Sequence, residues 1–316
     1  MKLLADIGGT NARFALESDA GVIDVEVLAC ADYPTLDEAM RAYLGQAAGR
    51  GLAVERVRHA ALAIANPVEE DRVSMTNHHW SFSIEELRRR QGLETLLVVN
   101  DFAALAMSLP HLAAEGRQRI GGGIELQNRP IGLIGPGTGL GVSGVIPAGK
   151  RWIALAGEGG HVSFAPSTKE EVAILEALWA EYGHVSAERL LSGMGLELTH
   201  RVSSGRRLDA AGITRAAIDG SCADCVKTVG IFCAVLGSVA GNVALTLGAT
   251  GGMYIGGGIV PRLGKLFTES AFRARFEDKG RLGPYLARIP TYLITEQYPA
   301  LRGVSAMLSD HIATLQ

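Results

Sequence analysis

The chain opens with three short apolar segments separated by polar turns. Residues 3–7, 12–16 and 22–28 each have the length of a β-strand, and residues 8–11 between the first two read Gly-Gly-Thr-Asn. Short apolar runs bounded by glycine and asparagine are typical of strands joined by tight turns. The pattern therefore predicts a strand, a hairpin turn and two further strands.

Alternating helices and strands follow this meander. Helices are expected at residues 36–48, after the capping residue Ser83, and at residues 102–109. Strands are expected at residues 58–65, 72–77 and 95–99. This alternation indicates an α/β domain. The last of these strands ends at Asn100 and Asp101, and ligands of open α/β sheets bind beyond the carboxyl ends of strands, so we expect Asp101 to face a cleft.

The arrangement of a strand, a turn and two further strands occurs a second time, beginning at residue 131. Residues 131–135, 140–146 and 151–156 are strand-like, and the turn at residues 136–139 reads Pro-Gly-Thr-Gly. Glycine tolerates the unusual dihedrals of tight turns, and turn amides can converge on an anion. Two matching turns predict a duplicated domain that holds a nucleotide between its halves, with Asp6 suited to magnesium. The alternative is a plain hairpin with a solvated Asp6.

Two further segments place polar side chains beside glycines or in a helical turn. Glu158 and His161 lie in a glycine-rich loop that leaves both side chains unobstructed, unless they are simply solvated surface groups. Ser186 is expected to cap a helix that carries Glu188 near its start. Acidic residues are common in a first helical turn, so Glu188 indicates nothing on its own.

The remaining elements complete the second half. Helices are expected at residues 169–182, 221–247, after Pro261 and at 300–315, and strands at residues 253–255 and 291–295. The strand at residues 253–255 stops at residues 256–258, three glycines. We interpret it as the counterpart of the strand that ends at Asp101, with flat space that would admit a purine ring.

The composition fits a globular protein with two domains. The 316 residues are 47% hydrophobic and 20% charged. A chain of this length is usually too long to fold around a single hydrophobic core and forms two domains. We place a small domain at residues 1–110 plus 299–316 and a large one at residues 111–298. A net charge of −3 argues against nucleic acid or an anionic membrane as partner, and 40 glycines indicate heavy use of turns.

Targeting segments are not expected. Asp6 interrupts the first residues before they could form the apolar core that a signal peptide requires. The longest apolar stretch, residues 234–247, is interrupted by glycine and polar residues and falls short of the ~18 residues of a membrane span. We therefore expect a cytoplasmic protein.

Some short motifs match known sites only in part. Residues 139–144 satisfy G-x-G-x-x-G but alternate like a strand, whereas a dinucleotide site requires the motif to open a helix. His78 and His79 would face opposite sides of a strand, which argues against a shared metal. Cys222 and Cys225 lack a second ligand pair and lie in a helical run, so we interpret them as reduced, buried thiols rather than a zinc site.

Taken together, the motifs resemble the bacterial ATP-dependent glucokinase family, which shares the fold of actin, Hsp70 and hexokinase. The resemblance is carried by residues 4–13, 75–78 with Trp80, 100–102, 137–141, 157–161, 190–193 and 256–258. It implies an α/β, two-domain actin-like ATPase (ribonuclease H-like) fold with duplicated strand-turn-strand phosphate loops and an interdomain cleft.

The resemblance also implies a role for each motif. Asp101 would take the proton from the 6-hydroxyl of glucose, and the other sugar contacts would be Asn100, Glu158, His161 and Glu188. The phosphates of ATP would be bound by Gly8, Gly9, Thr10, Asn11, Gly137, Thr138 and Gly139. The adenosine would be contacted by Gly256, Gly257 and Gly258. Asp6 would hold Mg²⁺ through water, and homodimers are usual in the family.

These roles agree with the chemistry of phosphoryl transfer, which requires positioning and charge neutralisation rather than a reactive protein group. Deprotonation of the attacking hydroxyl needs one carboxylate, worth typically ~10² to 10⁴ in rate. Acids and an imidazole accept the protons of sugar hydroxyls, and an analogue lacking one hydroxyl would leave such an acceptor unpaired.

Several alternatives remain. A kinase for fructose or mannose would use the same machinery, and a chaperone-like or filament ATPase would have no use for the sugar-binding cluster. A sugar-sensing regulator would need a DNA-binding segment, for which a first strand beginning at residue 3 leaves no room. The related repressor and sugar-kinase family follows its Glu-x-Gly-His run with a cysteine-rich zinc segment. Residues 162–166 contain no cysteine here, so no structural zinc is expected.

Overall fold

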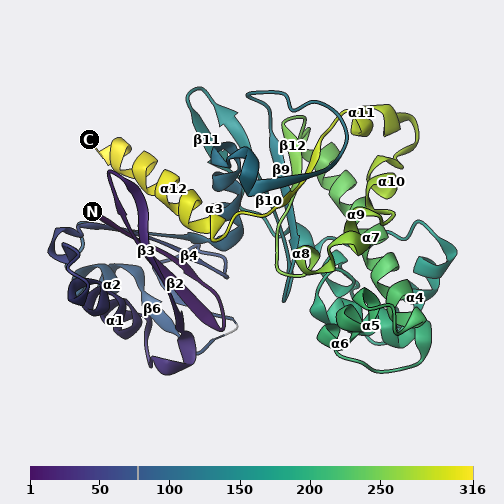
Figure 1. Ribbon diagram of the computed structural model, residues 1–316, viewed down its shortest axis with the longest axis horizontal. Coiled ribbons are helices and arrows are strands. Elements are labelled where there is room, and N and C mark those ends of the chain that lie inside the picture. Colours follow the sequence, from purple (N-terminus) through teal and green to yellow (C-terminus); the bar gives the residue numbers. More distant parts are fainter. Residues whose placement is uncertain (77, 316) are drawn as a thin grey trace. The chain divides into compact units, whose positions relative to one another are not determined.

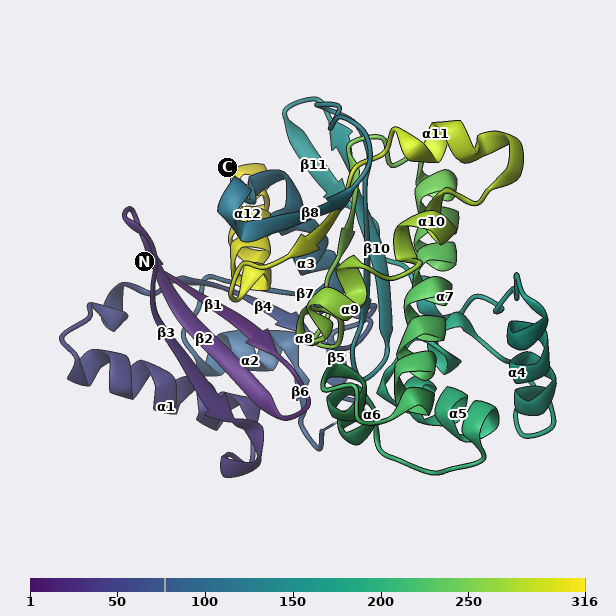
Figure 2. The ribbon, with the colours of Figure 1, turned by 45° about the vertical axis from the view of Figure 1, so that its right-hand side comes forward.

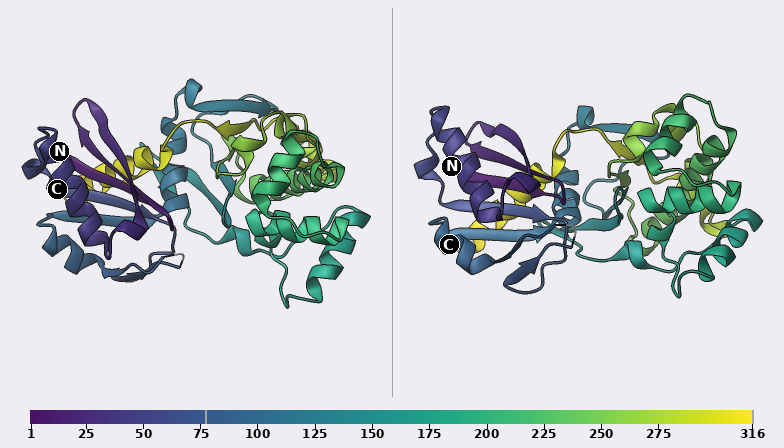
Figure 3. Two further views of the ribbon diagram at one scale, coloured as in Figure 1. Left: turned by 60° about the horizontal axis from the view of Figure 1, so that its bottom comes forward. Right: turned by 90° about the horizontal axis from the view of Figure 1, so that it is seen from below.

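The computed structural model describes residues 1–76 and 78–315, and Asn77 of the 75–78 motif lies outside them. The chain divides into two compact units (Figure 1). Unit 1 comprises Met1–Leu112, Ala148–Ala156 and Glu296–Gln316, and unit 2 comprises Ala113–Pro147 and Gly157–Thr295. Both chain ends belong to unit 1 (Figure 3), where the Lys2 ammonium donates to the Ser309 hydroxyl over 2.9 Å.

The sheet of unit 1 contains five strands, visible in Figure 2. Their order is β3 (Gly21–Ala29), β2 (Asn11–Ser18), β1 (Lys2–Ile7), β4 (His59–Ile64) and β7 (Thr95–Asn100). Strands β1, β4 and β7 are parallel, and Asp6, Ala63 and Val99 share one row. The carboxyl ends of these three strands therefore meet at one edge, which carries Asp6 and Asp101.

Helices cover both faces of this sheet because successive side chains point to opposite faces and the central strands β1 and β4 are apolar on both. Leu3, Ala5 and Ile7 face the core formed with α1 (Leu36–Gly49) and α2 (Ile84–Arg90). Leu4 faces the opposite core, formed with α3 (Asp101–Ser108) and α12 (Pro299–Leu315). Since residues two apart point to one face, Asp6 lies on the α3 and α12 side, as Leu4 does.

Helices α3 and α12 lie side by side and approach closely (Figure 1). Gly303 makes this possible, because a Cβ at that position would lie 1.7 Å from the carbonyl oxygen of Ala104. The sheet face beneath them contributes small residues, among them Ala61 and Ala63. The position of α3, whose first residue is Asp101, is therefore set by backbone contact with α12.

A short hairpin replaces the longer strand that the sequence predicts at residues 72–77. It pairs β5 (Arg72–Ser74) with β6 (Ser81–Ser83). The strand ends early because the Thr76 amide donates to the side chain of Asn66 (2.8 Å) instead of to a neighbouring strand. The predicted cap of the next helix is confirmed, since the Ser83 hydroxyl accepts from the Glu86 amide (3.1 Å).

The second sheet repeats the topology of the first. Its order is β11 (Arg151–Ala154), β10 (Leu140–Ala148), β9 (Ile131–Pro136), β12 (Gly252–Ile255), β13 (Thr291–Ile294) and β8 (Arg117–Gly121). Five strands in the order 3-2-1-4-5, present twice, identify the α/β actin-like ATPase (ribonuclease H-like) fold. Strand β10 also confirms that the G-x-G-x-x-G run opens no helix.

One predicted equivalence is wrong. Strand β12, which ends before the glycines at residues 256–258, lies next to β9 and is parallel to it. This is the place that β4 occupies beside β1, so β12 corresponds to β4 and β13 corresponds to β7. Strand order depends on which edges pair in space, and the sequence pattern does not contain that information.

Helix α7 (Ala223–Leu247) runs through the centre of unit 2, in contact with α5, α6 and α10 (Figure 2). The other helices of unit 2 are α4 (Lys169–Trp179), α5 (Gly193–Ser204), α6 (Ala210–Ile218), α8 (Val260–Leu263), α9 (Lys265–Thr268), α10 (Phe272–Glu277) and α11 (Gly283–Ala287). The 3₁₀ turns of the chain are Cys30–Asp32, Val54–Arg56, Leu109–His111, Ala114–Gly116, Gly159–His161, Ala187–Arg189 and Gly280–Leu282.

Three expectations for unit 2 need correction. The apolar stretch that was expected to fall short of a membrane span belongs to α7, and this helix is long and apolar enough to cross a membrane. However, 72% of its most apolar 18-residue segment is buried inside the structure, as in a core helix. Ser186 makes no side-chain cap, because residues 187–189 form only a 3₁₀ turn. Helix α8 begins at Val260 rather than after Pro261, since proline is tolerated in a first helical turn.

We predict that Gly303→Ala destabilises the protein by at least about 2 kcal/mol, because the methyl group would overlap the backbone of α3. Gly45→Ala is the matched control in α1, where an added Cβ meets nothing within 4 Å. It should be neutral or stabilise by about 0.5 to 1 kcal/mol. Urea unfolding followed by circular dichroism measures both, and equal midpoints would contradict the prediction.

Candidate active site

The carboxylate of Asp6 lies in an ion pair at the carboxyl end of β1. Its Oδ2 accepts from Arg13 Nη1 over 3.1 Å, and the Asp6 side chain is 19% exposed. Burial raises the pKa of Asp6 above its usual 3.8, and the Arg13 charge partly opposes this shift. The guanidinium of Arg13 also lies over the ring of Tyr298, 5.8 Å from its centre.

Asn100 and Asp101 form the junction between β7 and α3. The Asn100 side-chain oxygen accepts from the amides of Phe102 (2.9 Å) and Ala103 (3.0 Å), so Asn100 is the N-cap of α3. Asp101 Oδ1 accepts from the Phe102 amide (2.8 Å) and from Asn100 Nδ2 (3.2 Å). The Asp101 carboxylate is thus oriented by the first turn of its own helix.

Asn66 is a functional candidate that sequence reasoning missed. Its carbonyl accepts from Asn100 Nδ2 (3.3 Å), and its side chain bonds both Ser74 and Thr76. It therefore joins the end of β4 to the end of β7. In the sequence, Asn66 follows a predicted strand and precedes Pro67. This position predicted the end of the strand but not the contacts of the Asn66 side chain.

The first glycine turn is closed by one backbone bond, from the Gly8 amide to the Asn11 carbonyl (3.0 Å). Neither Gly8 nor Gly9 has a positive φ, so the expectation that unusual dihedrals require these glycines is wrong. The amides of Gly9 and Thr10 donate to no residue that the structure describes. These donors are therefore available to an anion.

The second turn is one residue shorter than the first. Three residues separate the last paired residues Pro136 and Leu140, whereas four separate Ile7 and Ala12. The Gly137 amide bonds the Gly139 carbonyl (2.8 Å), and neither glycine has a positive φ. The duplication is therefore approximate in the turns, although the sheet order repeats.

The glycines that follow β12 contact this second turn. Gly257 has φ +78°, and a Cβ there would lie 2.3 Å from the Pro136 carbonyl oxygen, so only glycine fits. The Gly256 amide donates to the Ile134 carbonyl (2.8 Å). A Cβ on Gly258 would meet no described atom within 4 Å, which leaves open space on that side of the loop.

Glu188 is anchored to the other side of the turn. Its Oε2 accepts from the Leu140 amide over 2.8 Å, and an added Cβ on Gly139 would lie 2.5 Å from the same oxygen. Gly160, from the loop that carries Glu158 and His161, also packs here, since its Cβ would lie 2.0 Å from the Leu140 carbonyl oxygen. The turn at residues 136–140 therefore contacts Glu188 and both of the glycine loops, at Gly160 and at Gly257.

His161 and Glu188 lie at the ends of a short antiparallel pairing. Ser163 pairs with Ser186, and the flanking bonds run from Ala187 to Val162 (2.9 Å) and from Phe164 to Val185 (2.9 Å). Extending this register by two residues places His161 opposite Glu188. Both side chains line one cavity of about 420 Å³, a volume typical of small-molecule sites.

The same cavity contains residues that the sequence did not single out. His184 bonds the His161 carbonyl through Nε2 (3.0 Å), and Arg189 lies over the ring of Tyr182, 4.2 Å from its centre. These residues surround Glu188 in the sequence. Tyr182 was expected at the end of a helix over residues 169–182, but α4 ends at Trp179. The contacts of these residues are made in turns and are set by tertiary packing, which the sequence pattern does not contain.

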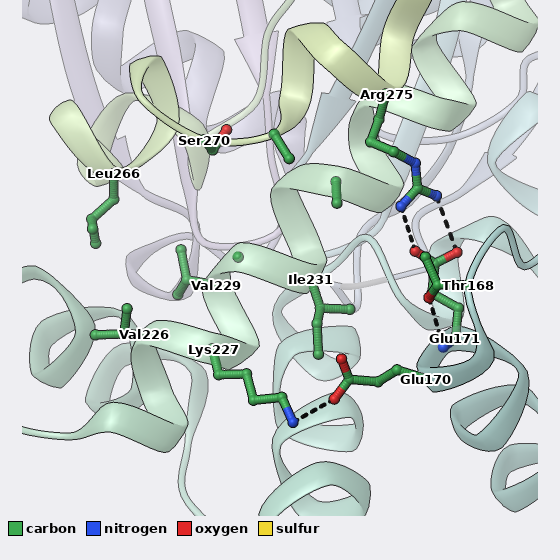
Figure 4. Close-up of a pocket in the computed structure, with 13 residues that line it drawn as sticks. Thr168, Glu170, Glu171, Val226, Lys227, Val229, Ile231, Leu266, Ser270 and Arg275 are labelled. Carbon is green, nitrogen blue, oxygen red and sulfur yellow. Dashed lines mark hydrogen bonds and ion pairs between the residues drawn. The ribbon is translucent and has the colours of Figure 1, made fainter. Parts of the chain in front are cut away.

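A second groove of unit 2, about 480 Å³, contains none of the predicted site residues (Figure 4). Its wall includes a bidentate ion pair between Arg275 and Glu171, at 2.7 and 3.1 Å. Among residues 1–76 and 78–315, no three His, Cys, Asp or Glu side chains lie together in a way that could hold a metal ion.

Comparison with known proteins decides the family. The glucokinase family model matches residues 3–311. The chain belongs to the glucokinase family. A glucokinase of Chromobacterium violaceum is 55% identical over 319 residues, which cover 99% of this chain and 90% of that protein. The family membership that the motifs predict is thereby confirmed.

Some relatives in the family are longer. A bifunctional protein of Burkholderia pseudomallei is 55% identical over 320 residues, which cover 99% of this chain but 49% of that protein. The chain thus spans about half the length of these relatives. Among solved structures, a glucokinase from an Antarctic psychrotroph shares 36% identity and a TM-score of 0.88, with 98% of each chain covered.

We predict that Asp6→Asn changes the pH dependence of stability in a defined direction. Because the pKa of Asp6 is raised in the folded protein, wild-type stability falls as pH rises from 3.8 through the folded value. The variant lacks this loss, so its free energy of unfolding relative to wild type should increase as pH rises above 3.8. Urea unfolding at several pH values measures the difference, and a constant difference would contradict the assignment.

Proposed function

We propose that the protein transfers the γ-phosphate of ATP to the 6-hydroxyl of glucose, giving glucose 6-phosphate and ADP. The observation that carries the proposal is the placement of Asp101 in a chain of the glucokinase family. It begins α3 at the sheet edge that also carries Asp6 and the first glycine turn.

Asp101 acts as the general base in this proposal. Its carboxylate accepts the proton of the glucose 6-hydroxyl while the hydroxyl oxygen attacks the γ-phosphorus and ADP leaves with the electrons of the broken bond. The amide of Phe102 and the side chain of Asn100 hold Oδ1 of this carboxylate before substrate arrives. Such preorganisation supports the role, because positioning is the main requirement of the reaction.

Sugar recognition is assigned to Asn100, Glu158, His161 and Glu188. Support comes from unit 2, where His161 and Glu188 line one cavity and Glu158 directly precedes the 3₁₀ turn that ends at His161. Carboxylates and an imidazole accept bonds from ring hydroxyls. A sugar that lacks a hydroxyl would leave one of these acceptors unpaired, which gives selectivity.

The nucleotide is assigned to the glycine turns. In this proposal the residues that hold phosphate are Gly8, Gly9, Thr10, Asn11, Gly137, Thr138 and Gly139, and those beside adenosine are Gly256, Gly257 and Gly258. The available amides of Gly9 and Thr10 and the open space at Gly258 support it.

Magnesium is proposed at Asp6. Proteins usually bind Mg²⁺ through one or two carboxylates, several waters and the substrate phosphates, so one aspartate beside a phosphate turn fits this ion. When bound, the ion would neutralise charge on the phosphates. Asp6 would hold its waters, while Arg13 orients the carboxylate and partly opposes the rise in its pKa that burial causes. The family resemblance further supports a cytoplasmic homodimer.

A panel of hexoses tests the substrate. With purified protein, ATP and magnesium, a coupled assay should show the highest kcat/KM for glucose, because the acceptors assigned above match its hydroxyls. Equal or better turnover of fructose or mannose would reassign the protein to another hexose. Glucose binding without turnover of any sugar would favour the sugar-sensing alternative.

Asp101→Asn tests the mechanism. We expect kcat to fall about 10² to 10⁴-fold, because the amide cannot accept the proton, while glucose affinity measured by calorimetry changes little. The side-chain oxygen that remains in this variant can still accept from the Phe102 amide, so the fold should be preserved. Asp19→Asn, an exposed change of the same charge in unit 1, is the control. Near-normal turnover of the Asp101 variant would remove it as the base.

A further inference from the structure

Cys222 and Cys225 lie together at the start of α7, outside the residues assigned to phosphoryl transfer. Cys222 is the N-cap residue, and its Sγ accepts from the Cys225 amide over 3.3 Å. Cys222 is partly exposed, whereas Cys225 is buried. One accessible thiol therefore lies directly against a buried one.

The geometry allows these two sulfur atoms to bond. Disulfides join cysteines whose Cα atoms are about 4.4 to 6.8 Å apart, and an N-cap side chain that reaches the third residue of its helix meets that requirement. The Cys222 sulfur already lies against the backbone nitrogen to which the Cys225 side chain is linked through its Cα. Only side-chain rotation at the first turn of α7 is needed.

The surroundings make the two thiols unequal. Hydrogen bonds from the Cys225 thiol and amide lower the pKa of Cys222, although desolvation and the charge of Asp224 oppose the shift. Burial, together with the neighbouring Cys222, raises the pKa of Cys225 to about 11. An accessible thiolate beside a protonated partner is the arrangement in which the first sulfur attacks and the second resolves.

The other two cysteines provide an internal comparison. Burial raises the pKa of Cys233 to about 12, and burial also raises the pKa of Cys30, whose Sγ contacts the Gly8 carbonyl (3.4 Å). Both are buried. Their low thiolate content and poor access predict that neither reacts under conditions that oxidise Cys222.

We propose that Cys222 and Cys225 are a reversible dithiol redox site that reduces peroxides. The Cys222 thiolate attacks one oxygen of hydrogen peroxide and the O–O bond breaks, which gives a sulfenic acid and hydroxide. Cys225 sulfur then attacks Cys222 sulfur, the S–O bond breaks and the S–S bond forms. Overall two thiols and one peroxide give one disulfide and two waters, with two electrons passing from sulfur to oxygen.

This site is distinct from the proposed kinase chemistry. Helix α7 has 25 residues, so Cys222 and the C-terminal end of α7, which leads to β12 and the glycine loop, lie about 37 Å apart along its axis. Val226, directly after Cys225, lines the open groove of Figure 4. The groove thus reaches the residue next to Cys225, and Cys222 is itself partly exposed to solvent.

Mass spectrometry of the full chain tests the proposal. Reduced protein is treated with a small excess of hydrogen peroxide and its remaining thiols are alkylated under denaturing conditions. The peptide that contains both cysteines should lose two hydrogen atoms and resist alkylation, and dithiothreitol should reverse both changes. Cys30 and Cys233 should stay fully alkylated.

Two variants sharpen the test. Cys222→Ser keeps a good N-cap, so it should fold normally and form no disulfide. Cys225→Ala should leave a sulfenic acid on Cys222 that a 1,3-dione traps. The proposal is overturned if wild-type protein keeps four alkylable thiols after peroxide, if Cys222 is oxidised beyond the sulfenic acid without pairing, or if Cys30 or Cys233 reacts first.

Discussion

Direct contact between backbones, at positions where no Cβ fits, is the constraint on which both units depend. An added methyl group would lie 1.7 Å from the Ala104 carbonyl oxygen at Gly303, 2.0 Å from Leu140 at Gly160 and 2.3 Å from Pro136 at Gly257. Each contact lies next to a group assigned to substrate. The 40 glycines of the chain therefore serve close approach as well as turns.

The two units orient their carboxylates by different means. Asp101 accepts from an amide of its own helix, so the junction between strand and helix fixes its direction locally. Glu188 accepts from the Leu140 amide, 48 residues away in sequence, and depends on how a turn packs against β10. A mutation far from the chemistry would thus disturb Glu188 more readily than Asp101.

Burial raises the pKa of the Asp6 carboxyl and of the buried thiols alike, because it disfavours the charged form of each. Asp6 is held in a partly buried place that disfavours its charged form, and Arg13 only partly compensates, which is a cost typical of functional sites. Cys233, buried in the core around α7, is likewise kept protonated, and this makes its thiol inert. The pKa of Cys222 is lowered, because Cys222 lies at the helix start, where its sulfur is partly exposed and is hydrogen-bonded by the thiol and the amide of Cys225.

The sequence by itself determined the local features: both hairpins, the Ser83 cap, the junction at Asp101, and helix α7. These depend on residues within a few positions of one another, where periodicity and capping act directly. Only the tertiary structure decided that β12 corresponds to β4 and that Glu188 reaches Leu140. Strand order and long-range hydrogen bonds depend on which surfaces pack together. The pattern of polar and apolar residues shows the polarity of each surface, but it does not show which other surface will pack against it.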